Sequence, residues 1–251
     1  MRFFIKLSYN GINYHGWQKQ KNNNTIEEEI EKKFSIILKE NINIIGASRT
    51  DSGVHANIMF AHFDYNFNII KIKKKIIYKI NLIISKDIKI KDIFAVKPKI
   101  HARYNVLYRE YKYIISYEKN PFNLNFYWYW WRKKKININL MNKAIEIIIK
   151  RKNFFLFCKK KKEIKKNYNC NIYYAFWKKI NNKIFFFIKA NRFLRKMVRF
   201  IISKCIEIGI KKINIYDLRK KIQNNKLSYN INVPPYGLYL NKIKYKKNIF
   251  L

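Results

Sequence analysis

The residues best suited to chemistry lie in one short segment, residues 46–56, which reads GASRTDSGVHA. It holds two of the six glycines, one of the four histidines, and Arg49 and Asp51 two positions apart. The carboxylate of Asp51 can act as a nucleophile, and the planar guanidinium of Arg49 can engage phosphate. The alternative is a polar turn capped by Asp51, since aspartate readily accepts hydrogen bonds from nearby backbone amides.

Other short segments along the chain favour the first interpretation. In chain order they read YNG at 9–11, GWQKQ at 16–20, HAR at 101–103, REYKY at 109–113, FLRKMVR at 193–199 and PPYGLYL at 234–240. Together with residues 46–56 they span nearly the whole chain. In these segments the chain resembles the tRNA pseudouridine synthase A family, and residues 46–56 resemble the family's catalytic segment.

The resemblance implies four catalytic residues. Asp51 matches the family's catalytic aspartate, and Arg49 matches an arginine that occupies the gap left when the target base leaves its stack. Tyr111 matches a tyrosine that stacks on the target uracil, and Arg199 matches the basic partner of the aspartate. From the residues alone, Tyr111 also fits core packing in a strand, and Arg199 also fits a solvated helix face.

Substrate contacts are implied in the same way. The residues expected to bind the substrate are Arg49, Tyr111, Arg192, Arg195 and Leu240. One segment departs from the family pattern, because residues 153–158 read NFFLFC where hydroxyl side chains are typical. This departure either alters a loop near the substrate or reflects relaxed composition.

The implied reaction converts uridine to pseudouridine at positions 38–40 in the anticodon stem-loop of tRNA. The bond between N1 and the ribose breaks, the base turns, and C5 bonds to the ribose without a net change in composition. Neither a cofactor nor a metal is required. Whether Asp51 attacks the base or the ribose stays open. Family members are homodimers, so a homodimer is expected here.

Two other functions also fit a basic chain of this kind. One is a non-catalytic RNA-binding or RNA-folding protein on the same scaffold, against which the intact segment with Arg49 and Asp51 argues. The other is a basic structural protein of the ribosome, which would have no need for Asp51. Neither a phosphate-binding P-loop pattern nor a zinc-deaminase pattern is present in the sequence.

The charge of the chain points to a polyanionic partner. Its 55 Lys and Arg against 15 Asp and Glu give a formal net charge of +40, which attracts nucleic acid. Part of the lysine excess is attributable to A- and T-rich codons, because Ile, Asn, Phe and Tyr are abundant too. Such a codon bias disfavours arginine, so the arginines are more informative than the lysines. Several of them fall within the matched segments.

The cysteines and the apolar stretches bear on location. Cys158, Cys170 and Cys205 lack the spacing of a zinc site or a disulfide framework, and a reducing cytoplasm is expected. The strand-like start leaves no room for a signal peptide. Residues 122–131, the most aromatic stretch, are too short to span a bilayer. We therefore expect a cytoplasmic protein without a membrane segment.

Hydrophobic periodicity predicts alternating strands and helices. Strands are expected at 2–8, 44–45, 54–60, 88–96, 106–117, 172–180, 183–190 and 237–245. Helices are expected from residue 26 and at 69–80, 140–150, 193–208 and 216–223. Thr25 and Glu28 are expected to form a capping box at the first helix, and Gly209 to end the helix 193–208. On that helix, one polar face is expected to carry Arg192, Arg195, Lys196 and Arg199.

This order of elements predicts an α+β fold with two similar domains. Residues 1–105 would carry the loop with Asp51, and residues 106–251 would complete the site. Each domain is expected to hold an antiparallel or mixed sheet with helices on one face. The resemblance further implies that the two sheets join around a central basic cleft.

Overall fold

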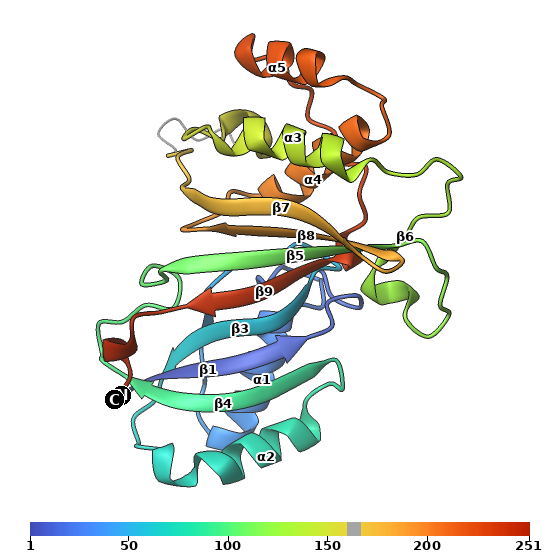
Figure 1. Ribbon diagram of the computed structural model, residues 1–251. Coiled ribbons are helices and arrows are strands. Elements are labelled where there is room, and N and C mark those ends of the chain that lie inside the picture. The colour runs from blue at the N-terminus through green and yellow to red at the C-terminus, as the bar shows by residue number, and fades with distance from the viewer. Residues whose placement is uncertain (160–166) are drawn as a thin grey trace. The chain divides into compact units, whose positions relative to one another are not determined.

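The computed structural model describes residues 1–159 and 167–251 and is drawn in Figure 1. Packing divides the chain into two compact units, Met1–Arg109 with Tyr239–Leu251, and Glu110–Leu238. We call them unit 1 and unit 2. The sequence-based division assigned residues 239–251 to the second domain, whereas they pack with unit 1. Both units combine helices with a sheet, so the predicted α+β class is confirmed.

Unit 1 is built on a sheet whose strand order is β4 (Ile88–Val96), β1 (Arg2–Tyr9), β3 (His55–Asp64) and β9 (Leu238–Lys244). β1 is antiparallel to both of its neighbours, whereas β9 runs parallel to β3. The short strand β2 (Ile45–Gly46) pairs with β3. The segment that carries Asp51 therefore connects two paired strands of this sheet.

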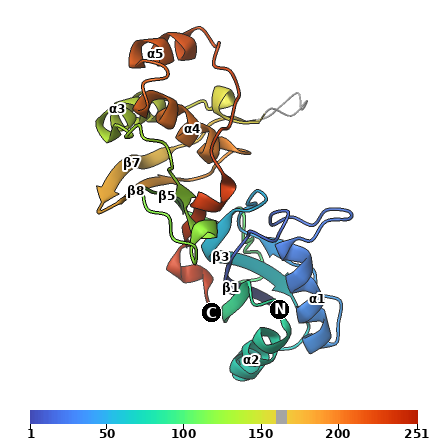
Figure 2. The same ribbon diagram turned by 90° about the vertical axis from the view of Figure 1, so that its right-hand side faces the viewer.

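Two helices cover the sheet of unit 1, α1 (Ile26–Leu38) and α2 (Lys73–Ile83), and Figure 2 shows both on the same side of its strands. Phe34 of α1 meets Phe63 of β3 edge to face at 5.2 Å, and Phe63 stacks on Phe3 of β1 at 5.6 Å. This aromatic row joins α1 to the centre of the sheet.

Unit 2 holds strands β5 (Tyr108–Ser116), β8 (Lys183–Ala190) and β7 (Ile172–Ile180) in that order. β7 and β8 form an antiparallel hairpin, and β6 (Trp128–Tyr129) pairs parallel with β5. Helix α3 (Ile138–Ile149) packs against β7, against α4 (Met197–Gly209) and against α5 (Ile215–Gln223). The bounds of β4, β7 and β8 are those that the sequence predicted.

The start of α4 differs from the prediction. Lys196 has the left-handed backbone angle φ 59°, and the helix begins only at Met197. Arg192 and Arg195 therefore precede the helix, and the expected polar face shared with Arg199 is wrong. Of the four basic residues, only Arg199 lies within α4.

The interior of α4 also differs from the expected amphipathic helix. Almost every residue of α4 is buried, including Lys204 and Glu207, which form an ion pair at 3.0 Å. A Cβ at Gly209 would lie 2.8 Å from Met141 Cγ, so this glycine allows close packing of α3 on α4. Its backbone is not left-handed; that conformation occurs at Lys211, with φ 56°. Gly209 is the last residue of α4, so the helix ends there as predicted, one position beyond the expected bound.

One further expectation is corrected by local contacts. Thr25 precedes α1 as predicted, but its side chain makes no capping hydrogen bond, and Glu28 pairs with Lys32 at 3.1 Å. The expected capping box is therefore absent. Within residues 153–158, Phe154, Leu156, Phe157 and Cys158 are buried. Their apolar side chains contribute to the core of unit 2.

Candidate active site

Asp51 lies in the loop between β2 and β3, where it is half-buried, while Arg49 is exposed. The amide of Val54 donates to the Asp51 carbonyl at 3.2 Å and closes a turn. Gly53 has φ 74°, a conformation that glycine adopts without the steric cost that other residues meet. The segment therefore contains a turn, and Asp51 is its first residue.

Residues 9–17 hold this loop from one side. The Tyr9 hydroxyl and Thr50 Oγ1 share a hydrogen bond of 2.8 Å. The amide of Trp17 donates to the Thr50 carbonyl at 3.2 Å, and the amide of Gly53 donates to the Tyr14 carbonyl at 3.3 Å. Peptide groups on both sides of Asp51 are thus fixed by neighbours from a distant part of the sequence.

Trp17 connects this support to helix α1 and to Arg49. The indole is almost fully buried, and its Nε1 donates to Glu27 Oε1 at 2.9 Å. The Lys19 amide donates to the other carboxylate oxygen at 2.8 Å. Burial raises the pKa of Glu27, although these hydrogen bonds and the positive charge of Arg49 oppose that shift. Arg49 therefore lies close enough to interact electrostatically with this carboxylate.

Arg109 holds the loop from the other side. Its buried guanidinium donates to the Ala47 carbonyl from Nε at 3.1 Å and from Nη2 at 2.6 Å. Nη2 also donates to the Arg103 carbonyl at 2.7 Å. A charged donor that satisfies several carbonyls strengthens the hydrogen bonds involved. The start of the loop is thus anchored to two of the segments that carry the resemblance.

The end of the loop enters β3 at His55, which is 1% exposed. Its Nδ1 accepts a hydrogen bond from the Gly11 amide at 3.1 Å, and its ring lies 4.8 Å from that of Tyr239. In the next register position, Ala56 pairs with Leu240, which is fully buried. Leu240 therefore contributes to the packing around the strand that leaves the loop.

The other residues predicted for the site belong to unit 2. Tyr111 of β5 is 6% exposed and meets the ring of Phe193 edge to face at 5.1 Å. Arg199 donates from Nη2 to the Val233 carbonyl at 2.8 Å. Arg199 thus links α4 to the segment that leads toward β9.

The predicted site residues fall into two groups. Unit 1 carries Arg49, Asp51 and Leu240, and unit 2 carries Tyr111, Arg192, Arg195 and Arg199. Both Arg192 and Arg195 are exposed at the surface. Sequence reasoning did not assign a role to the residues that support the loop, which are Tyr9, Gly16, Trp17 and Arg109. The sequence did contain a clue to these residues, since all four lie in segments that carry the family resemblance.

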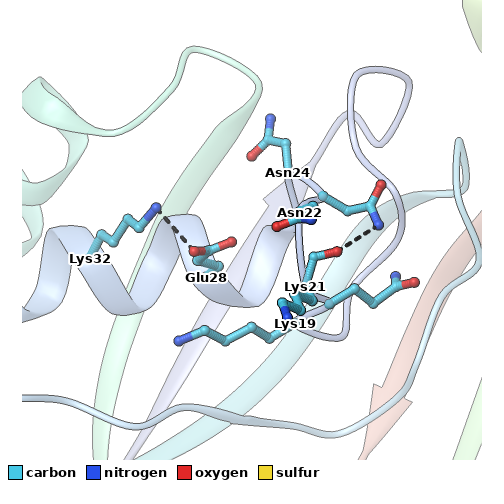
Figure 3. A pocket seen from close by; sticks show the side chains of 8 residues that line it. Lys19, Lys21, Asn22, Asn24, Glu28 and Lys32 are labelled. Atoms are coloured by element: carbon cyan, nitrogen blue, oxygen red, sulfur yellow. Dashed lines mark hydrogen bonds and ion pairs between the residues drawn. The ribbon is translucent and has the colours of Figure 1, made fainter.

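An open polar hollow lies beside the loop 19–24 and the first turns of α1 (Figure 3). Lys19, Lys21 and Lys32 line it, together with asparagines and Glu28. Asp51 and Arg49 are not among its lining residues.

Within residues 1–159 and 167–251, no group of three His, Cys, Asp or Glu side chains is placed to hold a metal ion. In the same residues, no helix is long and apolar enough to cross a membrane.

Comparison with known proteins agrees with the resemblance seen in the sequence. A family model described as tRNA pseudouridine synthase matches residues 151–246. The tRNA pseudouridine synthase A of Azobacteroides pseudotrichonymphae is 42% identical over 99% of this chain and 98% of its own length. The tRNA pseudouridine synthase A of Bacteroides fragilis is 36% identical with the same coverage. That of Dictyoglomus thermophilum is 36% identical over 96% of this chain and 98% of its own length.

These matches extend over nearly the whole of both chains. With the α+β fold, they define the class of the protein, an isomerase of the pseudouridine synthase type. The chain belongs to the tRNA pseudouridine synthase A family.

Proposed function

We propose that this protein converts uridine to pseudouridine at positions 38–40 in the anticodon stem-loop of tRNA, with Asp51 as the catalytic carboxylate. The relatives that it matches over nearly full length are named tRNA pseudouridine synthase A. The observation that carries the site is the held loop, in which the residues around a half-buried Asp51 are fixed by long-range hydrogen bonds. Such preorganisation favours reaction because little has to move when the substrate arrives.

In the proposed reaction, Asp51 acts beside the target nucleoside. The bond from the ribose to N1 breaks, the uracil turns, and C5 forms the new bond to the ribose. C5 then loses its proton and N1 regains one, so atoms and charge balance without a redox partner. A carboxylate can assist either as a nucleophile or by stabilising positive charge, and both forms require Asp51 to be ionised.

The remaining site residues take supporting roles in this proposal. Arg49 occupies the space of the displaced base or engages phosphate, since its guanidinium is exposed on the same loop as Asp51. Tyr111 stacks on the uracil, and its hydroxyl assists the proton step at C5. Arg199 is the basic partner of the catalytic carboxylate, and Leu240 supports the wall of the pocket.

The proposed substrate contacts extend to Arg192 and Arg195 at the surface, which neutralise phosphates of the tRNA. We further propose that the protein acts in the cytoplasm as a homodimer, with one tRNA spanning both subunits. The net charge of +40 is consistent with a large polyanionic substrate.

The decisive experiment compares Asp51→Asn with the wild type on unmodified tRNA, with pseudouridine mapped at single-nucleotide resolution. The variant should fold and bind tRNA, because the amide is nearly isosteric with the carboxylate. Its rate of pseudouridine formation should fall by about a hundredfold or more, the usual cost of removing such a group. A near wild-type rate would refute the assignment of Asp51, and modification only outside positions 38–40 would refute the proposed target.

A further inference from the structure

The first residues of helix α1 are tied to residues that hold the loop carrying Asp51. The amide of Ile26 donates to the Gly16 carbonyl at 3.2 Å, and the amide of Glu27 donates to the Trp17 carbonyl at 3.0 Å. The first amides of a helix have no partner within the helix itself, and here these two carbonyls satisfy them. The entry to α1 is thus joined to Trp17 through the backbone.

The side chain of Glu27 strengthens this junction. Its Oε1 accepts a hydrogen bond from Trp17 Nε1 at 2.9 Å, and its Oε2 accepts one from the Lys19 amide at 2.8 Å. Both oxygens of one carboxylate are therefore used, each by a different donor. An ionised carboxylate makes such hydrogen bonds about twice as strong as those between neutral groups. Together with the backbone contact, these bonds fix both the position and the orientation of the Trp17 ring.

Trp17 transmits this restraint to the Asp51 loop, residues 47–54, at two points. The indole lies against Gly46, the last residue of β2, where a Cβ would stand 2.4 Å from the ring atoms Cε2 and Nε1. The Trp17 amide donates to the Thr50 carbonyl at 3.2 Å. Because Asp51 follows Thr50 directly, a shift of Trp17 would move the peptide that leads into Asp51.

Neighbouring carboxylates of α1 contact other parts of unit 1. Glu29 accepts the Ser85 amide at 3.3 Å, beyond the end of α2. Glu31 accepts the Ile44 amide at 2.9 Å, just before β2. Of these three carboxylates, Glu27 is the one that holds Trp17. Glu29 offers a matched control, since it lies on the same helix, is half-buried like Glu27 and also accepts a backbone amide.

We propose that Glu27 is a positioning residue for the reaction, which holds Asp51 in place through Trp17. Glu27 does not touch the substrate; it restricts the loop before tRNA binds. Such restraint matters because a displacement of about 1 Å at a reacting group can cost about a hundredfold in rate. The inference rests on the proposed function, in which Asp51 is the catalytic carboxylate. It adds to the site a residue that lies outside the segments carrying the family resemblance.

The first test compares single-turnover rates at saturating enzyme on unmodified tRNA. Glu27→Ala removes both acceptors, so its rate should fall by about a hundredfold while its affinity for tRNA stays near that of the wild type. Glu27→Gln retains one acceptor oxygen, and its rate should lie between those of the wild type and Glu27→Ala. Glu29→Ala should react like the wild type. A wild-type rate in Glu27→Ala would overturn the proposal.

A double-mutant cycle tests whether Glu27 acts through Trp17. Trp17→Phe keeps a ring but removes the Nε1 donor, and it should slow the reaction as well. If the two residues act as a unit, Trp17→Phe combined with Glu27→Gln should be hardly slower than the slower of the two single variants. Losses that multiply would show that Glu27 acts independently of Trp17 and would overturn the proposed route. These conservative variants keep the test valid if Glu27→Ala does not fold.

Hydrogen exchange reports on the loop without any reaction. The amides of Gly53 and Val54 donate to carbonyls of Tyr14 and Asp51, and they should exchange faster in Glu27→Gln than in the wild type or in Glu29→Ala. The change should be confined to peptides that cover residues 46–54. Unchanged exchange, or faster exchange throughout unit 1, would make Glu27 a general structural residue and overturn its positioning role.

The same measurement separates this proposal from the proposed function. The wild-type protein could form no pseudouridine, or Asp51→Asn could react normally, while the Glu27 variants still show faster exchange confined to the loop. That combination would overturn the catalytic role of Asp51 and leave the hold of Glu27 on the loop intact. Normal activity that depends on Asp51, together with unchanged loop exchange in the Glu27 variants, would overturn the positioning role alone.

Discussion

Gly16 lies against the backbone of Thr50 so closely that a Cβ at Gly16 would stand 2.6 Å from the Thr50 carbonyl oxygen. The same glycine has φ 93°, in a region that other residues rarely adopt. Two independent constraints, space and backbone conformation, thus require glycine at this position. Since the peptide bond after Thr50 leads directly into Asp51, the position of the loop that carries Asp51 depends on Gly16, a residue far away in the sequence.

Gly16→Ala should therefore damage both stability and catalysis. Forcing a side chain into this conformation costs on the order of 1–3 kcal/mol, and a small displacement of the loop can slow reaction by about a hundredfold. Urea unfolding and single-turnover rates on tRNA measure the two effects. Gly209→Ala is the control, because its Cβ would meet the flexible side chain of Met141 at 2.8 Å. It should change stability while leaving the rate of the folded enzyme intact; a normal rate in Gly16→Ala would contradict the prediction.

A second prediction separates the ring of Tyr111 from its hydroxyl. Tyr111→Phe should bind tRNA like the wild type but turn over more slowly, because stacking is retained and only the hydroxyl is lost. Tyr111→Ala should lose stacking and activity together. Single-turnover rates at saturating enzyme isolate the chemical step. Normal turnover in Tyr111→Phe would leave the hydroxyl without a chemical role, and normal turnover in both would make Tyr111 a packing residue.

The third prediction concerns Arg192 and Arg195 at the surface. Replacing both with Gln should weaken tRNA binding and lower the slope of affinity against salt by about 0.9 for each duplex phosphate that is no longer neutralised. Binding is measured by filter retention over a series of salt concentrations. Arg219→Gln on α5 removes one exposed arginine from another surface and serves as the control. If the double variant and the control behave alike, the two arginines are merely solvated.

The fourth prediction follows from His62, which is buried in β3. Its Nδ1 accepts a hydrogen bond from the Ala102 amide at 3.2 Å, which requires a neutral ring. Burial above all, and then the positive charges of Arg2 and His101, lowers the pKa of His62 to about 4. Because the unfolded chain has a histidine pKa of about 6.5, protonation favours unfolding between these values. The stability associated with neutral His62 is present above about pH 6.5 and is lost as the pH falls toward 4.

Urea unfolding at a series of pH values from about 7 to about 4.5 tests this expectation. His62→Gln should be less stable at neutral pH, but its stability should fall less steeply with acid. His15→Gln is the control, since His15 is exposed, and it should keep the wild-type pH dependence. An equally steep fall in His62→Gln would show that other groups cause the acid sensitivity.

Much of the fold follows from local patterns in the sequence. The alternation of apolar residues in β4, β7 and β8 reflects sheets with one buried face, and it predicted the bounds of these strands. The start of α4 was missed because Lys196 takes a left-handed conformation, which lysine does not favour and which its residue type therefore does not indicate. The end of α4 at Gly209 was predicted, but the close contact of this glycine with Met141 of α3 was not, because packing between helices leaves no local pattern in the sequence.

The sequence likewise predicted only part of the candidate site. Asp51 and Arg49 could be singled out because their segment differs so clearly in composition, and the resemblance supplied their roles. The contacts of Tyr9 with Thr50 and of Arg109 with Ala47 join residues 41 and 62 positions apart. No periodicity reports such distant pairs, so the support of the loop became visible only in three dimensions.

The place of β9 has a consequence for the synthesis of the protein. Unit 1 takes this strand from residues that follow all of unit 2, and the strand pairs at His55 and Ala56 of β3, which leaves the Asp51 loop. During synthesis, the strands before Arg109 are made early. Their last partner, β9, can pair with β3 only after translation has passed residue 238. The order of translation thus delays completion of the sheet that holds the Asp51 loop until all of unit 2 has been made, and a chain released early has an unfinished unit 1.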